Sequence, residues 1–218
     1  MKKSFLLVIA FCAIKLGYSQ TEQGKMFIGG QVSFLGNSQS QLDNQFKLNI
    51  HSNSFTLTPT FGYFIKDHLA IGVNVTYSYL NLNQTDGNLI DANLSYNYKS
   101  TTIGYGIGGF VRYYSDITDK FKFFLHGGFS YLNTEQKSTS STSVNRDFIT
   151  NSTTFSIAPG LVYFVTPKFG IQTTFGNLFY SINKAKTKDS PYDNHDNSNP
   201  YGLNLNPATF SLGLCYYF

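Results

Sequence analysis

The sequence predicts an all-β protein, an eight-stranded antiparallel up-and-down transmembrane β-barrel. Apolar residues recur at every second position in eight separate runs, which is the period of a strand with two different faces. The chain is 17% aromatic and only 13% charged, whereas a water-soluble domain has about 25% charged residues. The connections between the runs alternate between short and long, which is typical of barrels that span a membrane.

The amino terminus has the three parts of a secretory signal peptide. Two lysines precede an uncharged, mostly apolar run at 4–14, which Lys15 ends, and Gly17 and Ser19 are small residues at the positions that a signal peptidase needs. The run is too short to anchor the chain, because a membrane-spanning helix needs about 20 residues. We therefore expect a cleaved signal peptide at 1–19 and a β-barrel domain at 20–218.

Charge and cysteine content exclude several classes of protein. Removal of residues 1–19 takes away three lysines and no acid, which lowers the formal charge from +4 to +1. The basicity therefore belongs mainly to the signal, and no nucleic-acid partner is expected. Cys215 is the only cysteine in the rest of the chain, so an internal disulfide framework and a cysteine-rich metal site are excluded.

The first four runs each set an apolar face against a small or polar face. In the third run, Val73 and Val75 alternate with Asn74 and Thr76. In the fourth run, glycines alternate with larger residues such as Tyr105. These runs lie at 26–34, 55–63, 69–77 and 102–113.

The last four runs repeat this pattern up to the carboxyl terminus. They lie at 121–131, 155–163, 169–176 and 210–218. The seventh run loses its register near Asn177, where we expect a bulge. Long connections are expected at 36–52, 81–98, 133–151 and 182–206, and short ones at 66–68, 116–120 and 166–168.

The composition of the polar face indicates which face of the sheet points out of the barrel. It consists mainly of Gly, Ser, Thr and Ala, whereas a surface in contact with water carries many Lys and Glu. The apolar face is therefore predicted to meet lipid. The sheet must then close, because an open edge in lipid leaves backbone groups unpaired. A soluble barrel with its apolar face inside is the alternative, and a two-domain chain is disfavoured because no linker interrupts the runs.

Three segments resemble the outer-membrane β-barrel domain family of the OmpA/OmpX type, particularly its porin-like members from Bacteroidetes. They are the hairpin at 59–72, its looser repeat at 159–170, and the terminal sequence LGLCYYF at 212–218. The resemblance implies a location in the cell outer membrane, with outer-membrane lipid as a partner. It also implies assembly by the barrel assembly machinery through the carboxy-terminal strand, which ends in Phe218.

Two motifs superficially suggest ligand chemistry. The glycine-rich piece at 104–109 lacks the strand, turn and helix that a dinucleotide loop needs. The oxygen-rich piece at 189–199 lacks the glycine and the distal glutamate of an EF-hand loop, so a hydrated loop is expected. No pair of histidines has metal-ligand spacing. We therefore predict no cofactor, no metal and no catalytic residue.

Three basic side chains are predicted to point into the lumen. Arg112, Lys122 and His126 occupy inward positions of adjacent strands, and Asp116 and Asp119 lie in the intervening turn. Buried charges need partners, so we expect a polar plug near the turn. An anion-selective constriction is the functional alternative, but it needs a wider pore than eight strands leave.

The predicted inward strand positions carry no acidic residue, which leaves no paired carboxylates for acid–base catalysis. Loop groups such as Asp91, Glu135, Asp147 and His195 are the remaining possibility for an enzymatic rim. The leading hypothesis is a non-enzymatic membrane protein with a structural or surface-interaction role through its extracellular loops, whose ligand the sequence does not reveal. The alternative is transport of a small solute through the lumen or through a lateral opening.

Overall fold

The structure is a computed structural model that describes residues 20–42, 46–88, 96–141, 147–188, 195–205 and 211–218. The regular elements among these residues are all β-strands. In chain order they are β1 (Met26–Leu42), β2 (Phe46–Lys66), β3 (Leu69–Asn88), β4 (Tyr96–Thr118), β5 (Phe121–Ser140), β6 (Phe148–Thr166), β7 (Phe169–Thr174), β8 (Asn177–Thr187), β9 (His195–Ser198), β10 (Tyr201–Asn204) and β11 (Ser211–Tyr217). In these described ranges, no helix is long and apolar enough to cross a membrane.

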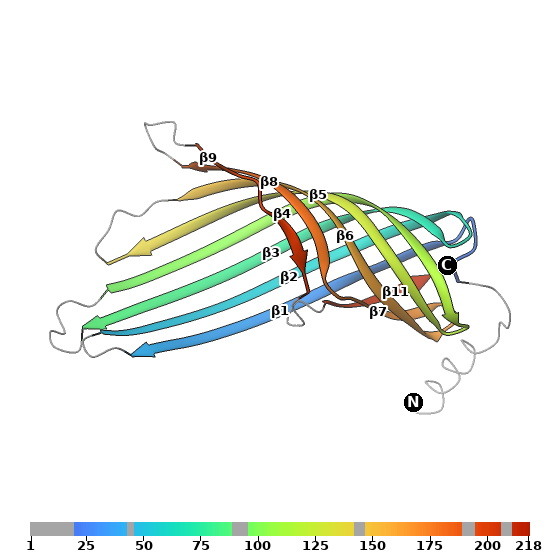
Figure 1. Cartoon of the computed structure of the whole chain (residues 1–218), viewed down its shortest axis with the longest axis horizontal. Coiled ribbons are helices and arrows are strands. Elements are labelled where there is room, and N and C mark those ends of the chain that lie inside the picture. Colours follow the sequence, from blue (N-terminus) through green and yellow to red (C-terminus); the bar gives the residue numbers. More distant parts are fainter. Residues whose placement is uncertain (1–19, 43–45, 89–95, 142–146, 189–194, 206–210) are drawn as a thin grey trace, which may run out of the picture.

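The described strands close into an eight-membered ring. Its order is β1–β2–β3–β4–β5–β6–β7–β11, and β11 pairs back onto β1. All neighbouring strands in the ring are antiparallel (Figure 1). They are also consecutive in the chain, except for the pair β7–β11 and the closing pair β11–β1. The predicted up-and-down barrel is confirmed.

The last two barrel strands are each built from two pieces. β7 ends at Thr174 and β8 begins at Asn177, with Gly176 between them in the left-handed region at φ 70°. β7 pairs with β11, whereas β8 pairs with β10. The irregularity expected near Asn177 is therefore present, as an interruption between two strands. β9 and β10 lie where the sequence pattern indicated a loop.

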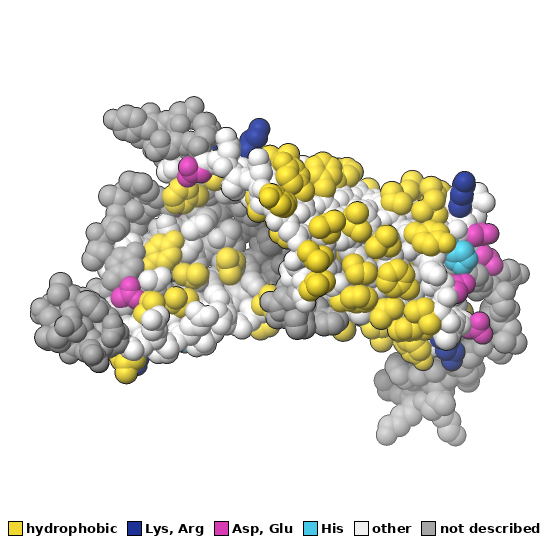
Figure 2. Space-filling view, viewed as in Figure 1, with side chains coloured by type: hydrophobic (Ala, Val, Ile, Leu, Met, Phe, Trp, Pro, Cys, Tyr) yellow, Lys and Arg dark blue, Asp and Glu magenta, His cyan; other side chains and the backbone are white. Residues whose placement is uncertain are grey.

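The two faces of the sheet separate apolar from polar side chains. Outward residues such as Val73, Ile107 and Phe129 are more than half exposed, and hydrophobic side chains cover the barrel body in Figure 2. Inward residues such as Phe64 and Phe124 are fully buried. We call the outward apolar residues the apolar belt; it covers 26–34 of β1, 55–63 of β2, 69–79 of β3, 103–113 of β4, 121–131 of β5, 155–165 of β6, and the outward positions of β7, β8, β10 and β11.

The two ends of the barrel differ. Two-residue turns at 67–68, 119–120 and 167–168 join strands at one end, the turn end, within the short connections predicted at 66–68, 116–120 and 166–168. At the opposite end, the loop end, the prediction of long loops was wrong, because strand pairing continues through much of 36–52, 81–98 and 133–151. There the outward positions become polar, so the period-two apolar signal disappears while the backbone ladder continues.

The segment before β1 packs beneath the turn end. Thr21 is fully buried, and its carbonyl accepts a hydrogen bond of 2.7 Å from the backbone N–H of His68. Its hydroxyl lies 3.0 Å from the His68 ring nitrogen Nδ1. His68 itself has φ 64°, a left-handed conformation in the β2–β3 turn. The predicted signal peptide at 1–19 lies outside the described residues.

Candidate functional site

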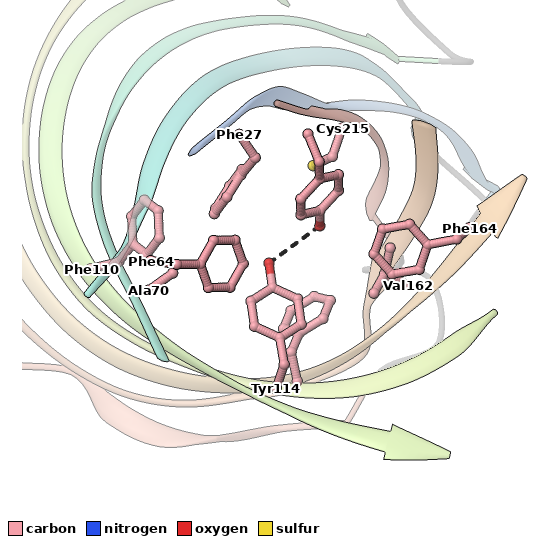
Figure 3. Close-up of a cluster of buried hydrophobic side chains, with 10 residues drawn as sticks. Phe27, Phe64, Ala70, Phe110, Tyr114, Val162, Phe164 and Cys215 are labelled. Carbon is pink, nitrogen blue, oxygen red and sulfur yellow. Dashed lines mark hydrogen bonds between the residues drawn. The ribbon is translucent and has the colours of Figure 1, made fainter. Parts of the chain in front are cut away.

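The lumen near the turn end is filled by aromatic rings. Phe27, Phe64, Tyr114, Phe124 and Phe164 are at most 1% exposed and come from five different strands. Figure 3 shows labelled members of this cluster pointing toward the centre of the barrel. The Tyr114 hydroxyl lies 3.4 Å from that of Tyr217, which reaches across from β11. We call this set, with Phe110, Val162 and Tyr217, the aromatic plug.

Arg112 lies at the centre of the aromatic plug. Its guanidinium carbon is 4.4 Å from the ring centroid of Phe124 and 5.4 Å from those of Phe27 and Phe110. It donates hydrogen bonds to Gln172 Oε1 at 2.9 Å and to the Tyr114 hydroxyl at 3.1 Å. Ring faces and neutral acceptors replace the water that this buried cation loses.

The surroundings of Arg112 differ in part from those predicted. Arg112, Lys122 and His126 all point inward, as expected, and Lys122 pairs with Asp116. Among the described residues, however, no carboxylate pairs with Arg112. The arginine instead lies 3.4 Å from His126 Nδ1. Asp119 is exposed in the turn. Of the two acids that were predicted to pair with the inward basic side chains, only Asp116 therefore does so.

Gln172 and Tyr217 were missed as partners of the central arginine and of Tyr114. Alternation along their strands gives them inward positions. Their contacts, however, depend on which residues face one another across the lumen. That is determined by the register of each strand against its neighbours around the closed ring. Gln172 is 1% exposed, and within the described ranges its Nε2 has no hydrogen-bond partner.

Glycines of the inner wall make room for larger side chains. A Cβ atom on Gly72 would collide with the Phe110 ring and with the Phe61 carbonyl oxygen. A Cβ atom on Gly104 would meet the Ser78 and Thr134 side chains, and one on Gly106 would meet the Tyr131 carbonyl oxygen and the Leu132 side chain. The glycine-rich piece at 104–109 is therefore part of a packed strand, as the sequence analysis expected.

The wall is open toward the loop end, between β1 and the β8–β10 unit. β11 pairs with β1 only as far as Val32, and among the described residues β2 is the only partner of the rest of β1. β10 likewise ends the sheet on the other side. Figure 2 shows the molecule hollowed at this place, with hydrophobic side chains visible inside the hollow.

Apolar residues line part of the inner surface behind this opening. Leu80 and Leu35 occupy inward positions but are 39% and 44% exposed. Leu82, Leu132 and Phe179 are inward and partly exposed. Among the described residues, the inward side chains of the loop-end half are thus less buried than those of the turn-end half.

A family model for the outer membrane protein beta-barrel domain matches residues 4–218. The chain belongs to this family. The protein is therefore an outer-membrane β-barrel, and its apolar belt lies in the outer membrane. Because barrels of this kind have short periplasmic turns and longer outer loops, the turn end faces the periplasm and the loop end faces outward.

Solved barrels are similar to the outer-membrane domain at low sequence identity. OprG from Pseudomonas aeruginosa is 15% identical with a TM-score of 0.49, covering 92% of this chain and 99% of that one. Neisserial surface protein A is 16% identical with a TM-score of 0.37, covering 90% and 100%. The attachment invasion locus protein Ail of Yersinia pestis is 15% identical with a TM-score of 0.31, covering 90% and 99%. No curated protein matches the sequence.

Charged groups meet at the outer rim of this outer-membrane barrel. Lys188 donates a hydrogen bond of 2.7 Å to Glu135 Oε1, and its backbone N–H binds the Asp147 carbonyl at 2.7 Å. Glu135 lies beyond the apolar belt, where the hydrogen bond and charge of Lys188 lower the pKa of its carboxyl group. Two of the four rim groups named from the sequence are thus linked through Lys188.

The other two rim groups remain outside this cluster. Asp91 lies outside the described residues, and His195 belongs to β9, which pairs with β8. Among residues the structure describes, no group of three His, Cys, Asp or Glu side chains is arranged to hold a metal ion. The oxygen-rich piece at 189–199 is described only from 195 onward, where it is strand and turn.

Proposed function

We propose that the protein is a non-enzymatic outer-membrane barrel that blocks solute flow along its axis and presents its outer end for surface interactions. The observation that carries this proposal is the aromatic plug, in which rings from many strands pack around Arg112 across the periplasmic half of the lumen. Eight-stranded barrels are filled by side chains in this way. The polar strand extensions beyond the apolar belt support the second half of the proposal, because they form a paired surface outside the lipid.

Two partners belong to this proposal. Lipid covers the apolar belt, and the barrel assembly machinery engages the terminal strand β11. The carboxy-terminal Phe218 is joined to Met26 by two backbone hydrogen bonds of 2.8 and 2.9 Å. Phe218 therefore lengthens by one residue the β1–β11 ladder that closes the ring.

Conductance tests the block. The folded monomer, reconstituted in planar bilayers, is expected to give no sustained single-channel current, because the buried side chains of the aromatic plug fill the lumen near the turn end. A pore-forming barrel in the same lipid is the positive control. Sustained currents that follow the amount of folded monomer would contradict the proposal.

The lateral opening favours a second candidate function, exchange of a small apolar solute between the medium and the bilayer through the outer half of the lumen. An apolar naphthylamine dye is expected to bind the wild-type barrel and to bind Leu80→Asn about fivefold more weakly, because an exposed apolar contact is lost. Ile103→Asn changes an outward residue on the neighbouring strand and serves as the control. Equal dye binding by both variants would rule out this candidate.

A further inference from the structure

The outer part of β1 is a sheet edge exposed on both faces. Every residue from Phe34 to Leu42 is exposed, including residues whose side chains point inward. On the neighbouring β2, inward residues at the same level, such as Ile50 and Ser52, are partly covered. The difference arises because β1 continues beyond Val32, the last residue that β11 covers.

The backbone groups that face this edge follow from the hydrogen bonds at the base of β1. Met26 exchanges two backbone hydrogen bonds with Phe218 on the β11 side, whereas Lys25 accepts one from Phe64 on the β2 side. Hydrogen-bonding direction alternates along a strand. The even-numbered residues beyond Val32 therefore direct their N–H and C=O groups toward the edge; they are Phe34, Gly36, Ser38, Ser40 and Leu42.

This edge has none of the features that normally prevent strand addition. Natural edge strands carry charged side chains, proline or bulges that discourage pairing. β1 contains no charged residue and no proline, and its pairing with β2 runs without a register shift. The opposite side of the opening is formed by β9 and β10, which do have such features. Each of these strands is only four residues long, β9 contains Asp196, and Pro200 lies between them. The two sides are thus protected unequally.

We propose that the outer edge of β1 (Phe34–Leu42) binds an extended, uncharged peptide segment of a partner protein as an added antiparallel strand. The added strand would lie on the same side of β1 as β11, which pairs antiparallel with β1 from Phe27 to Val32. It would extend this pairing beyond Val32. Main-chain hydrogen bonds supply the affinity in this mode of recognition. The inference rests on the proposed surface-interaction function and names its docking site.

A second copy of the barrel fits this edge less well. Two copies in one membrane both have β1 running outward, so their edges cannot pair antiparallel. With a strand tilt of about 35–45°, copies related by rotation about the membrane normal present β1 strands that cross at roughly twice that angle. A flexible peptide has no such restriction.

A peptide copying residues 48–55 is a suitable probe, because it carries no Lys, Arg, Asp or Glu and in β2 this sequence pairs with β1 from Phe34 to Gln41. Binding of the fluorescein-labelled peptide to the folded full-length barrel is followed by fluorescence anisotropy. Ser38→Pro removes an N–H directed at the edge and is expected to weaken binding about tenfold. Ser38→Ala keeps that N–H and loses only the 3.0 Å contact to His51, so it is the matched control and should bind like wild type.

Two further variants separate edge pairing from misfolding. Ser40→Pro changes a second edge-facing amide and should weaken binding in the same way, while both proline variants keep the gel mobility of the folded barrel. The peptide N-methylated at the amides of 49, 51 and 53 should not bind, because those amides lie opposite Ser40, Ser38 and Gly36.

Three results would overturn the proposal. Absence of saturable binding would show that the edge does not accept an added strand. Binding that survives both proline variants would place the peptide elsewhere. A wild-type dimer in sedimentation that Ser38→Pro abolishes would assign the edge to a second copy. None of these three results contradicts the proposed function, provided that the barrel gives no sustained current in planar bilayers. Sustained current would contradict the proposed function whatever the peptide-binding result.

Discussion

Replacing Val73 by arginine is expected to lower the free energy of unfolding in lipid bilayers by about 2 to 4 kcal/mol, because the charge would lie on the lipid face near the midplane. Val73 is 54% exposed on the outer surface, in the middle of the apolar belt. It is flanked by Phe61 of β2 and Gly109 of β4, which are outward as well. Equilibrium urea titration of the barrel in vesicles measures the loss.

Asn74 provides the matched position, because a shift of one residue reverses the face of a strand. Asn74→Arg places the charge in the lumen beside small residues such as Gly108, so crowding is its main cost. A fluorophore on Val73→Cys, in a Cys215→Ser background, should be quenched by a lipid-phase quencher much more than one on Asn74→Cys. Equal or reversed quenching would mean that the apolar face does not meet lipid.

Truncation of the aromatic plug is expected to have an even larger effect. Phe124→Ala should destabilise the barrel by about 3 to 5 kcal/mol, because it opens a cavity in a closely packed core. It also removes the ring that lies 4.4 Å from the Arg112 guanidinium carbon. The same titration in vesicles measures the change.

Phe129→Ala is the control for this truncation. Phe129 lies on the same strand but points outward and is 56% exposed. Lipid can fill the space that its ring leaves, so a much smaller loss is expected. Equal losses for the two variants would show that the packing around Arg112 contributes little to stability.

The membrane-embedded part of the fold was predictable from the sequence, because lipid and lumen impose opposite demands on alternate residues. Val73 and Asn74 illustrate this, as do the inward rings of Phe64 and Phe124. The two-residue turns followed from the gaps between the runs. The interruption near Asn177 was also visible, as a loss of alternation.

The outer half of the barrel was not predictable in the same way. Residues such as Asn81, Asn83 and Thr85 contact water on the outward face, so no apolar period marks them as strand. The partners of Arg112 were hidden for another reason. Alternation tells which face a residue occupies, but the contact with Gln172 depends on the stagger of the closed ring, which a single sequence does not encode locally.

The strand extensions set the height at which the outer end stands above the bilayer. From Phe55 at the border of the belt to Lys47, β2 continues in an unbroken ladder with β1. At about 3.3 Å per residue and a tilt of about 40°, this stretch rises roughly 20 Å. The headgroup layer is only about 5–8 Å thick. The edge of β1 therefore projects past the headgroups, where a large soluble protein can approach without touching the bilayer.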